Sequence, residues 1–256
     1  MGAYNSINDN YQKFANLSFN DFKKMAKDDS LSCYEKIGFP NSYREGKESL
    51  IFEDIITKLP LVLTQNKIIL DIGSGCSQLP LMLIELCKKN KHTLILMDSE
   101  EMLSLLPDEP FIIKIAGYYP NSDYLFNHFR GKIDVILTYS VLHYIFTESN
   151  IWEFLDSSLE LITDGGEMLI GDIPNISKRK RFFSSSNGIQ FHQDFMKTTE
   201  IPKVVFNNIE RHHIDDSILL ALINRARNQG FDSYIIPQRQ DLPMANRRED
   251  ILIKKP

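Results

Sequence analysis

From residue 67 onward, short apolar runs and amphipathic stretches follow one another along the chain. The runs are aliphatic, often β-branched, and bounded by polar residues or glycine, which predicts strands buried on both faces. Between them, apolar residues recur at three- and four-residue spacing, which predicts helices. The predicted strands are 68–71, 93–98, 111–115, 133–138, 167–172, 232–236 and 249–254, and the predicted helices are 47–59, 78–88, 99–105, 149–162 and 215–229.

This alternation predicts an α/β fold with a doubly wound, mostly parallel seven-stranded sheet. Strands 232–236 and 249–254 are too closely spaced for a crossover helix, so they should form an antiparallel hairpin. Because no linker, repeat or low-complexity tract divides the chain, we expect a single domain over residues 1–256.

Residues 67–79, Lys-Ile-Ile-Leu-Asp-Ile-Gly-Ser-Gly-Cys-Ser-Gln-Leu, join a strand, a glycine turn and a helix. Glycine has no Cβ, so the backbone can approach a ligand at the strand's carboxyl end. A tight turn that binds nothing is the simpler alternative. A dinucleotide-binding turn would need a third glycine where Gln78 stands. The next strand ends on Asp98, at the position where an acid receives a ribose diol.

Four segments, 71–75, 97–103, 134–144 and 161–170, together resemble the ordered motifs of class I S-adenosylmethionine-dependent methyltransferases. The resemblance covers residues 67–173. It implies a Rossmann-like fold, with S-adenosylmethionine as cofactor and S-adenosylhomocysteine as product.

The resemblance also implies roles for individual residues. Asp71, Gly73 and Gly75 should line the methionine part, and Asp98 should accept the two ribose hydroxyls. The family often has Gly-Asp after the third strand, whereas here Gly117 is followed by two tyrosines, which leaves adenine recognition to stacking and backbone groups. The full predicted cofactor set is Arg44, Asp71, Gly73, Ser74, Gly75, Asp98, Ser99, Met102, Gly117, Tyr118, Thr138, Tyr139 and Ser140.

The end of the fourth strand is where the methyl group should emerge. The sequence there is not the Asp/Asn-Pro-Pro-Tyr of nucleic-acid amino methyltransferases, and it lacks the clustered carboxylates of metal-dependent catechol-type enzymes. Both absences favour metal-free transfer to an oxygen of a small molecule. His143 is the predicted general base, because imidazole ordinarily titrates near neutrality; the alternative is a hydrogen-bonded histidine at a helix start. His192 is a second candidate base. The rings of Tyr139 and Tyr144 either contact the sulfonium or are ordinary core aromatics.

The predicted single domain has four segments. Residues 1–66 form a helical N-terminal lid rich in aromatics, including Tyr4 and Tyr11, with Ser18 or Asn20 as a helix cap. The alternative is a plain packing extension. In the resembled family such a lid often closes over the cofactor, and Arg44 should then pair with the methionine carboxylate. Residues 67–173 form the cofactor-binding core, and 215–256 the last helix and terminal hairpin.

Residues 174–214 interrupt the alternation of strands and helices. A connection this long in a compact domain is typical of a functional lid, so we interpret it as a cap on the acceptor side. Its basic run, Lys178 to Arg181, is either a solvated face or a site for a phosphate- or carboxylate-bearing acceptor.

Composition limits the partners. A net charge of −5 argues against a general nucleic-acid surface. No apolar stretch reaches membrane-spanning length and no signal peptide is evident, so we expect no membrane partner. Three cysteines without metal-site spacing indicate reduced thiols, hence a cytoplasmic protein with no metal. A monomer or a homodimer is expected.

Our leading interpretation is a methyltransferase acting on a small, anionic, phosphate-bearing or sugar-linked acceptor. The chain is rich in Lys, Asn and Ile, and with its cap it is similar to methyltransferases of bacterial surface-polysaccharide pathways, including those proposed to O-methylate a capsular phosphoramidate. A non-catalytic S-adenosylmethionine-binding partner subunit is the alternative. A nicotinamide-dependent oxidoreductase is disfavoured by Gln78 and Asp71.

Overall fold

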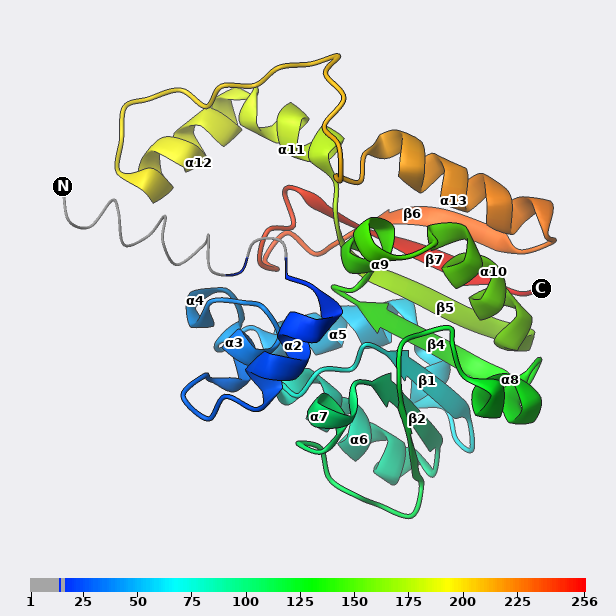
Figure 1. Ribbon diagram of the computed structural model, residues 1–256. Coiled ribbons are helices and arrows are strands. Elements are labelled where there is room, and N and C mark those ends of the chain that lie inside the picture. Colours follow the sequence, from blue (N-terminus) through cyan, green and yellow to red (C-terminus); the bar gives the residue numbers. More distant parts are fainter. Residues whose placement is uncertain (1–13, 15–16) are drawn as a thin grey trace.

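The computed structural model describes Phe14 and residues 17–256, so the predicted lid residues Tyr4 and Tyr11 lie outside the described part of the chain. The protein is built around a seven-stranded sheet with strand order β3-β2-β1-β4-β5-β7-β6 (Figure 1). β7 runs antiparallel to both of its neighbours, and the other pairings are parallel. The strands are β1 (Ile68–Ile72), β2 (Thr93–Asp98), β3 (Ile112–Ala116), β4 (Ile133–Tyr139), β5 (Ile162–Pro174), β6 (Asp232–Pro237) and β7 (Arg248–Lys254).

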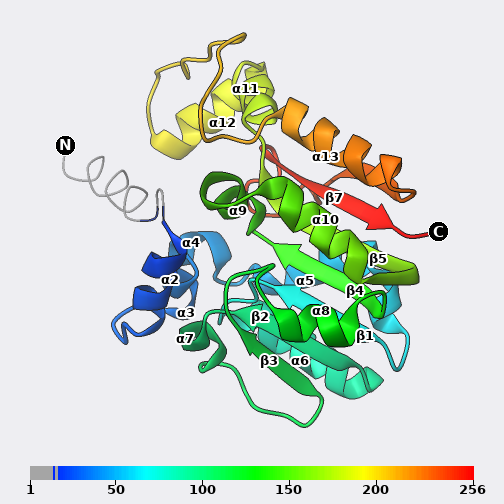
Figure 2. The same ribbon diagram turned by 45° about the vertical axis from the view of Figure 1, so that its right-hand side comes forward.

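The predicted fold class is confirmed: the sheet is mostly parallel, and residues 232–254 form the antiparallel hairpin. Helices cover both of its faces (Figures 1 and 2). One face is covered by α5 (Glu48–Lys58), the 3₁₀ helix η1 (Pro60–Leu63) and α6 (Gln78–Asn90). The other is covered by α8 (Asp123–Phe129), α9 (Leu142–Glu148), α10 (Ile151–Leu161) and α13 (Asp216–Asn228).

The alternation of side chains along each strand explains the two cores. In β2, Leu94 and Leu96 pack with α6 on one face, whereas Ile95 and Met97 pack on the other. Successive side chains of a strand point to opposite faces, so a strand covered on both sides must be apolar throughout. This constraint is why unbroken apolar runs predicted the strands.

Four helices were not predicted: α8, α9, α11 (Ile176–Phe183) and α12 (Ser186–Met196). The helix predicted over 149–162 begins at Ile151, because the Asn150 side chain caps it by accepting from the backbone N–H groups of Trp152 and Glu153. A separate helix, α9, precedes this cap. In both views α11 and α12 project from the body of the molecule (Figures 1 and 2).

The described part of the N-terminal segment forms α2 (Phe19–Ala26), α3 (Cys33–Lys36) and α4 (Asn41–Arg44). Ser18 caps α2 as predicted, through a capping box in which the Asp21 carboxylate accepts from the Ser18 backbone N–H. A further short helix, α7 (Glu100–Leu103), follows β2. Among the described helices, none combines the length and apolar character needed to cross a bilayer.

Phe154 of α10 is 1% exposed and meets the Tyr119 ring edge-on, with centroids 5.6 Å apart. Replacing it with alanine removes this packing and leaves a cavity, so we expect Phe154→Ala to lower the free energy of unfolding by about 3–5 kcal/mol. Urea unfolding followed by circular dichroism measures this loss. Leu220→Ala on α13 is the matched control, because Leu220 is 53% exposed; an equal loss in both variants would contradict the assignment of Phe154 to the core.

Candidate functional site

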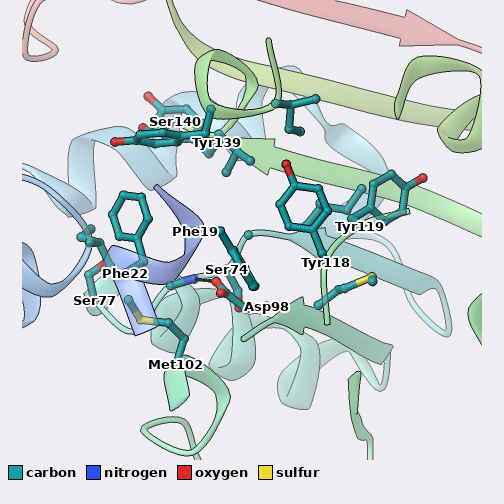
Figure 3. A pocket seen from close by; sticks show the side chains of 18 of the residues that line it. Phe19, Phe22, Ser74, Ser77, Asp98, Met102, Tyr118, Tyr119, Tyr139 and Ser140 are labelled. Carbon is teal, nitrogen blue, oxygen red and sulfur yellow. Dashed lines mark hydrogen bonds between the residues drawn. The ribbon is translucent and has the colours of Figure 1, made fainter. Parts of the chain in front are cut away.

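A cleft opens at the carboxyl ends of β1, β2 and β4 and is closed over by the N-terminal helices (Figure 3). It contains about 970 Å³ of non-atom space, counting the part open to solvent, a size typical of small-molecule sites. We call it the first cavity. It is lined by Phe19, Phe22, Ile37, Phe39, Arg44, Ile72, Gly73, Ser74, Gly75, Ser77, Leu79, Met97, Asp98, Met102, Gly117, Tyr118, Tyr119, Tyr139, Ser140, Val141, Tyr144, Ile145 and Glu148.

The glycine turn after β1 forms its floor. Gly73 and Gly75 have φ of +71° and +64°, a region that favours glycine. A Cβ on Gly73 would lie 2.6 Å from Val141 Cγ2, and one on Gly75 would lie 2.8 Å from Ile37 Cγ2. Both glycines therefore let the turn pack closely against its neighbours while its backbone faces the cavity.

Asp98 supplies a carboxylate beside the glycine turn. One of its oxygens accepts from the Gly75 N–H at 2.9 Å and the other from the Ser99 N–H at 2.6 Å. A carboxylate oxygen can accept more than one hydrogen bond, so each keeps capacity for a ligand hydroxyl. The pKa of Asp98 is raised by burial, although these hydrogen bonds oppose the shift.

Aromatic side chains form the wall opposite the sheet. Phe19 meets Tyr118 edge-on with centroids 5.1 Å apart, and Phe22 meets Tyr144 in the same way at 5.0 Å. In Figure 3, Asp98 and Met102 lie at one end of the cavity, and Tyr139 and Ser140 at the other. The cavity is thus polar at its ends and aromatic between them.

The end near β4 is organised around Arg44. This residue is only 3% exposed, and its guanidinium donates to Ser140 Oγ at 2.6 Å and to the Asp172 carboxylate at 3.4 Å. Ser140 Oγ donates to the same carboxylate at 2.5 Å. Ser140 and Asp172 have φ of +63° and +57°, a conformation that costs about 1–3 kcal/mol for a non-glycine residue. The surrounding contacts hold both strand ends in this conformation.

Asp172 also receives Gln238 Nε2 at 3.4 Å and lies 3.7 Å from Arg248 Nη1. Burial alone would raise the pKa of Asp172, but Arg248 and Arg44, with the hydrogen bonds from Ser140 and Gln238, lower it. Asp172 is therefore ionised at neutral pH. The carboxylate of Asp250, which is also buried, accepts a hydrogen bond from the backbone N–H of Asp172 at 2.8 Å.

Three predicted cofactor residues do not line the first cavity. Asp71 is buried behind the glycine turn, where burial and then Asp98 raise its pKa to about 8. Ser99 caps α7 by accepting from the Met102 N–H. Thr138 is fully buried, and its hydroxyl has no partner among the described residues. The other ten predicted residues line the cavity.

A second cavity, with about 1490 Å³ of non-atom space counted in the same way, lies beside the first and next to α11. Tyr144 and Glu148 of α9 line both cavities, so the two adjoin at that helix. The second cavity is lined by Phe14, Leu17, His143, Tyr144, Thr147, Glu148, Pro174, Asn175, Ile176, Arg179, His212, His213, Ile214, Arg247 and Arg248.

The predicted base, His143, faces this second cavity and not the first. Its Nδ1 is buried and has no hydrogen-bond partner among the described residues. Burial and the nearby Arg248 lower the pKa of His143 to about 3. The imidazole is therefore neutral at pH 7, but it does not titrate near neutrality as the sequence interpretation assumed.

His192, the second predicted base, lies on α12 with its ring centroid 6.3 Å from that of Phe183, and it lines neither cavity. Tyr139 lines the first cavity, where burial and then Asp172 raise its hydroxyl pKa well above the usual value. Among the described residues, no three His, Cys, Asp or Glu side chains are grouped so that they could hold a metal ion.

Sequence reasoning missed Asp172, Glu148, Arg247 and Arg248. Asp172 could have been found, because it ends the predicted fifth strand, where side chains of a parallel sheet converge on a site. The two arginines follow a loop without any motif. Only the antiparallel insertion of β7 beside β5 brings them to the second cavity.

No family model and no curated protein sequence matches this chain. Solved structures match its fold. The plantazolicin methyltransferase BpumL in complex with SAH is 17% identical, with 98% of each chain covered and a TM-score of 0.57. A chain from the complex of the Haloferax volcanii Trm112 methyltransferase activator with a methyltransferase is 10% identical, covering 92% of this chain and 98% of that one, with a TM-score of 0.56. A SAM-dependent methyltransferase from Aquifex aeolicus is 11% identical, covering 94% and 100%, with a TM-score of 0.53. These likenesses show that the fold is the Rossmann-like methyltransferase fold.

The lowered pKa of His143 predicts a pH dependence of stability. In the unfolded chain His143 binds a proton below its ordinary pKa of 6.5. In the folded protein it stays neutral until the pH falls to about 3. The contribution of His143 is therefore complete above pH 6.5 and is lost as the pH falls, by at most about 1.4 kcal/mol per pH unit. His143→Gln should lose less stability than wild type between pH 7 and pH 5 in urea unfolding. His192→Gln is the control, and parallel pH profiles for wild type and His143→Gln would contradict the shift.

Proposed function

We propose that this chain is an S-adenosylmethionine-dependent methyltransferase that binds its cofactor in the first cavity and methylates an oxygen of a small molecule bound in the second. One observation carries the proposal. The Asp98 carboxylate and the glycine turn form one end of a cleft whose other end, at β4, opens beside a separate cavity containing a neutral histidine. Two adjoining cavities are what a group transfer between two small molecules requires.

The residues of the first cavity fit the proposed cofactor. Asp98 has a free lone pair on each oxygen for the two ribose hydroxyls. Arg44 is a buried cation at the β4 end of the cavity, suited to the methionine carboxylate. Tyr118 and Met102 flank the space near Asp98 that the adenine would occupy. When bound, the cofactor supplies an electrophilic methyl group on a positively charged sulfur.

The chain's own contribution is chiefly alignment. Holding an acceptor oxygen in line with the methyl group can supply roughly 7–11 kcal/mol of the barrier. The faces of Tyr139 and Tyr144 stabilise positive charge near β4. His143 is neutral at pH 7 and its Nδ1 lacks a partner among the described residues, so it accepts a hydrogen bond from the acceptor hydroxyl and orients a lone pair of the oxygen toward the methyl.

Three residues would act from behind the cavity wall: Asp71, Ser99 and Thr138 position the turn and the strand ends without touching the cofactor. We also propose the division into N-terminal lid, core, cap and terminal hairpin. In this division the lid covers the cofactor, and the cap covers the acceptor. His192 has no catalytic role in this proposal.

We further propose that the acceptor is small and anionic, either phosphate-bearing or sugar-linked, as in the modification of a capsular phosphoramidate. The charge of the second cavity supports the anionic part. The competing interpretation, a non-catalytic subunit that only binds the cofactor, predicts cofactor binding without any methylation. The presence of a second cavity beside the first favours the enzyme.

Titration calorimetry with S-adenosylhomocysteine tests the cofactor site. We expect a Kd of micromolar order, and Asp98→Asn should weaken it about ten- to a hundredfold, because charge-assisted hydrogen bonds to two hydroxyls are lost. Asp108→Asn, at an exposed surface position, is the control. If wild-type protein binds no S-adenosylhomocysteine, the proposed function is wrong.

His143→Gln tests the role of the imidazole once an acceptor is found. We expect kcat to fall by about ten- to a hundredfold while the Kd of S-adenosylhomocysteine changes less than twofold, because His143 lies outside the first cavity. The measurement is single-turnover methyl transfer from labelled cofactor. An unchanged rate would show that the hydrogen bond to His143 is not needed for methyl transfer.

A further inference from the structure

The second cavity is positively charged although the chain as a whole carries −5. Three arginines and one carboxylate line it, which gives a formal charge of +2 without counting the histidines. The carboxylate, Glu148, lies at the boundary with the first cavity and accepts from the Phe19 N–H at 3.1 Å. The positive charge is therefore concentrated on the side away from the first cavity.

The arginines come from two segments that the structure ties together. Arg179 lies on α11, and Arg247 and Arg248 stand at the start of β7. The Asn175 N–H donates to the Arg247 carbonyl at 3.0 Å, and Lys178 Nζ donates to the Arg248 carbonyl at 2.7 Å. Guanidinium groups from separate elements are thus held around one space, as a tetrahedral oxyanion requires.

Two of these arginines, Arg179 and Arg248, retain donors for a ligand. Arg248 uses Nη1 on the Asp172 carbonyl at 2.9 Å, whereas its Nη2 meets only Met244 Sδ at 3.8 Å, a weak acceptor. Arg179 lies over the Phe183 ring, 5.2 Å from its centroid, and forms no ion pair within the part of the chain that the structure describes. Guanidinium N–H donors that the protein leaves unused beside a cavity favour an anionic ligand.

The predicted basic run is mostly engaged elsewhere. Lys180 pairs with Glu210 at 2.7 Å, and Arg181 pairs with Asp216. Lys178 is held by the Arg248 carbonyl. Only Arg179 of this run lines the second cavity. The run therefore offers one candidate ligand residue and, in Arg181, a neighbouring arginine that serves as its matched control.

We propose that the second cavity binds a phosphate group through Arg179 and Arg248, supported by Arg247, His212 and His213, and that the methyl acceptor is therefore a phosphate ester or a related phosphoryl compound. The identification of this compound as an acceptor rests on the proposed function; the anion site itself does not. A phosphate held at this side of the cavity leaves the rest of the acceptor to extend past His143 toward Tyr144, where the two cavities meet.

The test is titration calorimetry of the full chain with inorganic pyrophosphate at constant ionic strength, without cofactor. We expect saturable binding with one site per chain, and Arg179→Gln should raise the Kd about tenfold. Arg181→Gln should change it less than twofold, and sodium acetate should compete weakly. No pyrophosphate binding, or equal weakening by both variants, would overturn the site; acetate competing as well as phosphate would overturn its phosphate specificity.

A parallel titration with S-adenosylhomocysteine separates this inference from the proposed function. If the protein binds S-adenosylhomocysteine but does not bind pyrophosphate, the phosphate site is overturned and the methyltransferase proposal still stands. If the protein binds pyrophosphate but does not bind S-adenosylhomocysteine, the anion site is supported and the methyltransferase proposal is wrong. Arg248→Lys provides a second variant that keeps the charge beside buried Asp172, and its Kd for pyrophosphate should rise because the two-pronged donor is lost.

Discussion

The buried carboxylate of Asp172 holds four separate parts of the chain together. It is contacted by Arg44 from the N-terminal helices, Ser140 from the end of β4, Gln238 after β6 and Arg248 of β7. A buried charge is costly unless its partners are in place, and removing one partner leaves the rest uncompensated. The N-terminal helices, the strand ends and the terminal hairpin therefore depend on one another through this group. Arg44 lines the first cavity and Arg248 the second, so the same carboxylate pairs with one cation of each cavity.

Much of the fold could be predicted because its causes are local. Each central strand is buried on both faces, and that requirement alone makes its sequence an apolar run of strand length. The glycine turn and Asp98 were also found from sequence, because a parallel sheet brings the ends of β1 and β2 to the same edge. Ser18 was one of two predicted caps, and it is the one observed, because its hydroxyl and Asp21 satisfy backbone groups within one turn.

The remainder of the site depends on contacts between distant segments. Arg248 is 76 residues from Asp172 and reaches it only because β7 is inserted between β5 and β6. The pKa of His143 follows from burial and from that same arginine, so its residue type suggested a titration range that the folded protein does not have. Within the basic run, the polar partners of Lys178, Lys180 and Arg181 lie far along the sequence, and charge alone could not show that Arg179 differs from Arg181.

The position of β7 in the sheet determines which parts of the protein can fold while the chain is still being translated. β5 is synthesised well before residues 248–254, and until they emerge its outer edge exposes unpaired backbone groups beside apolar side chains. Such an edge is a template for association with other chains. Asp172 also lacks Arg248 and Gln238 during that interval. A nascent chain can thus form the turn at Gly73 early, whereas the contacts of Asp172 are completed only after translation has passed β7.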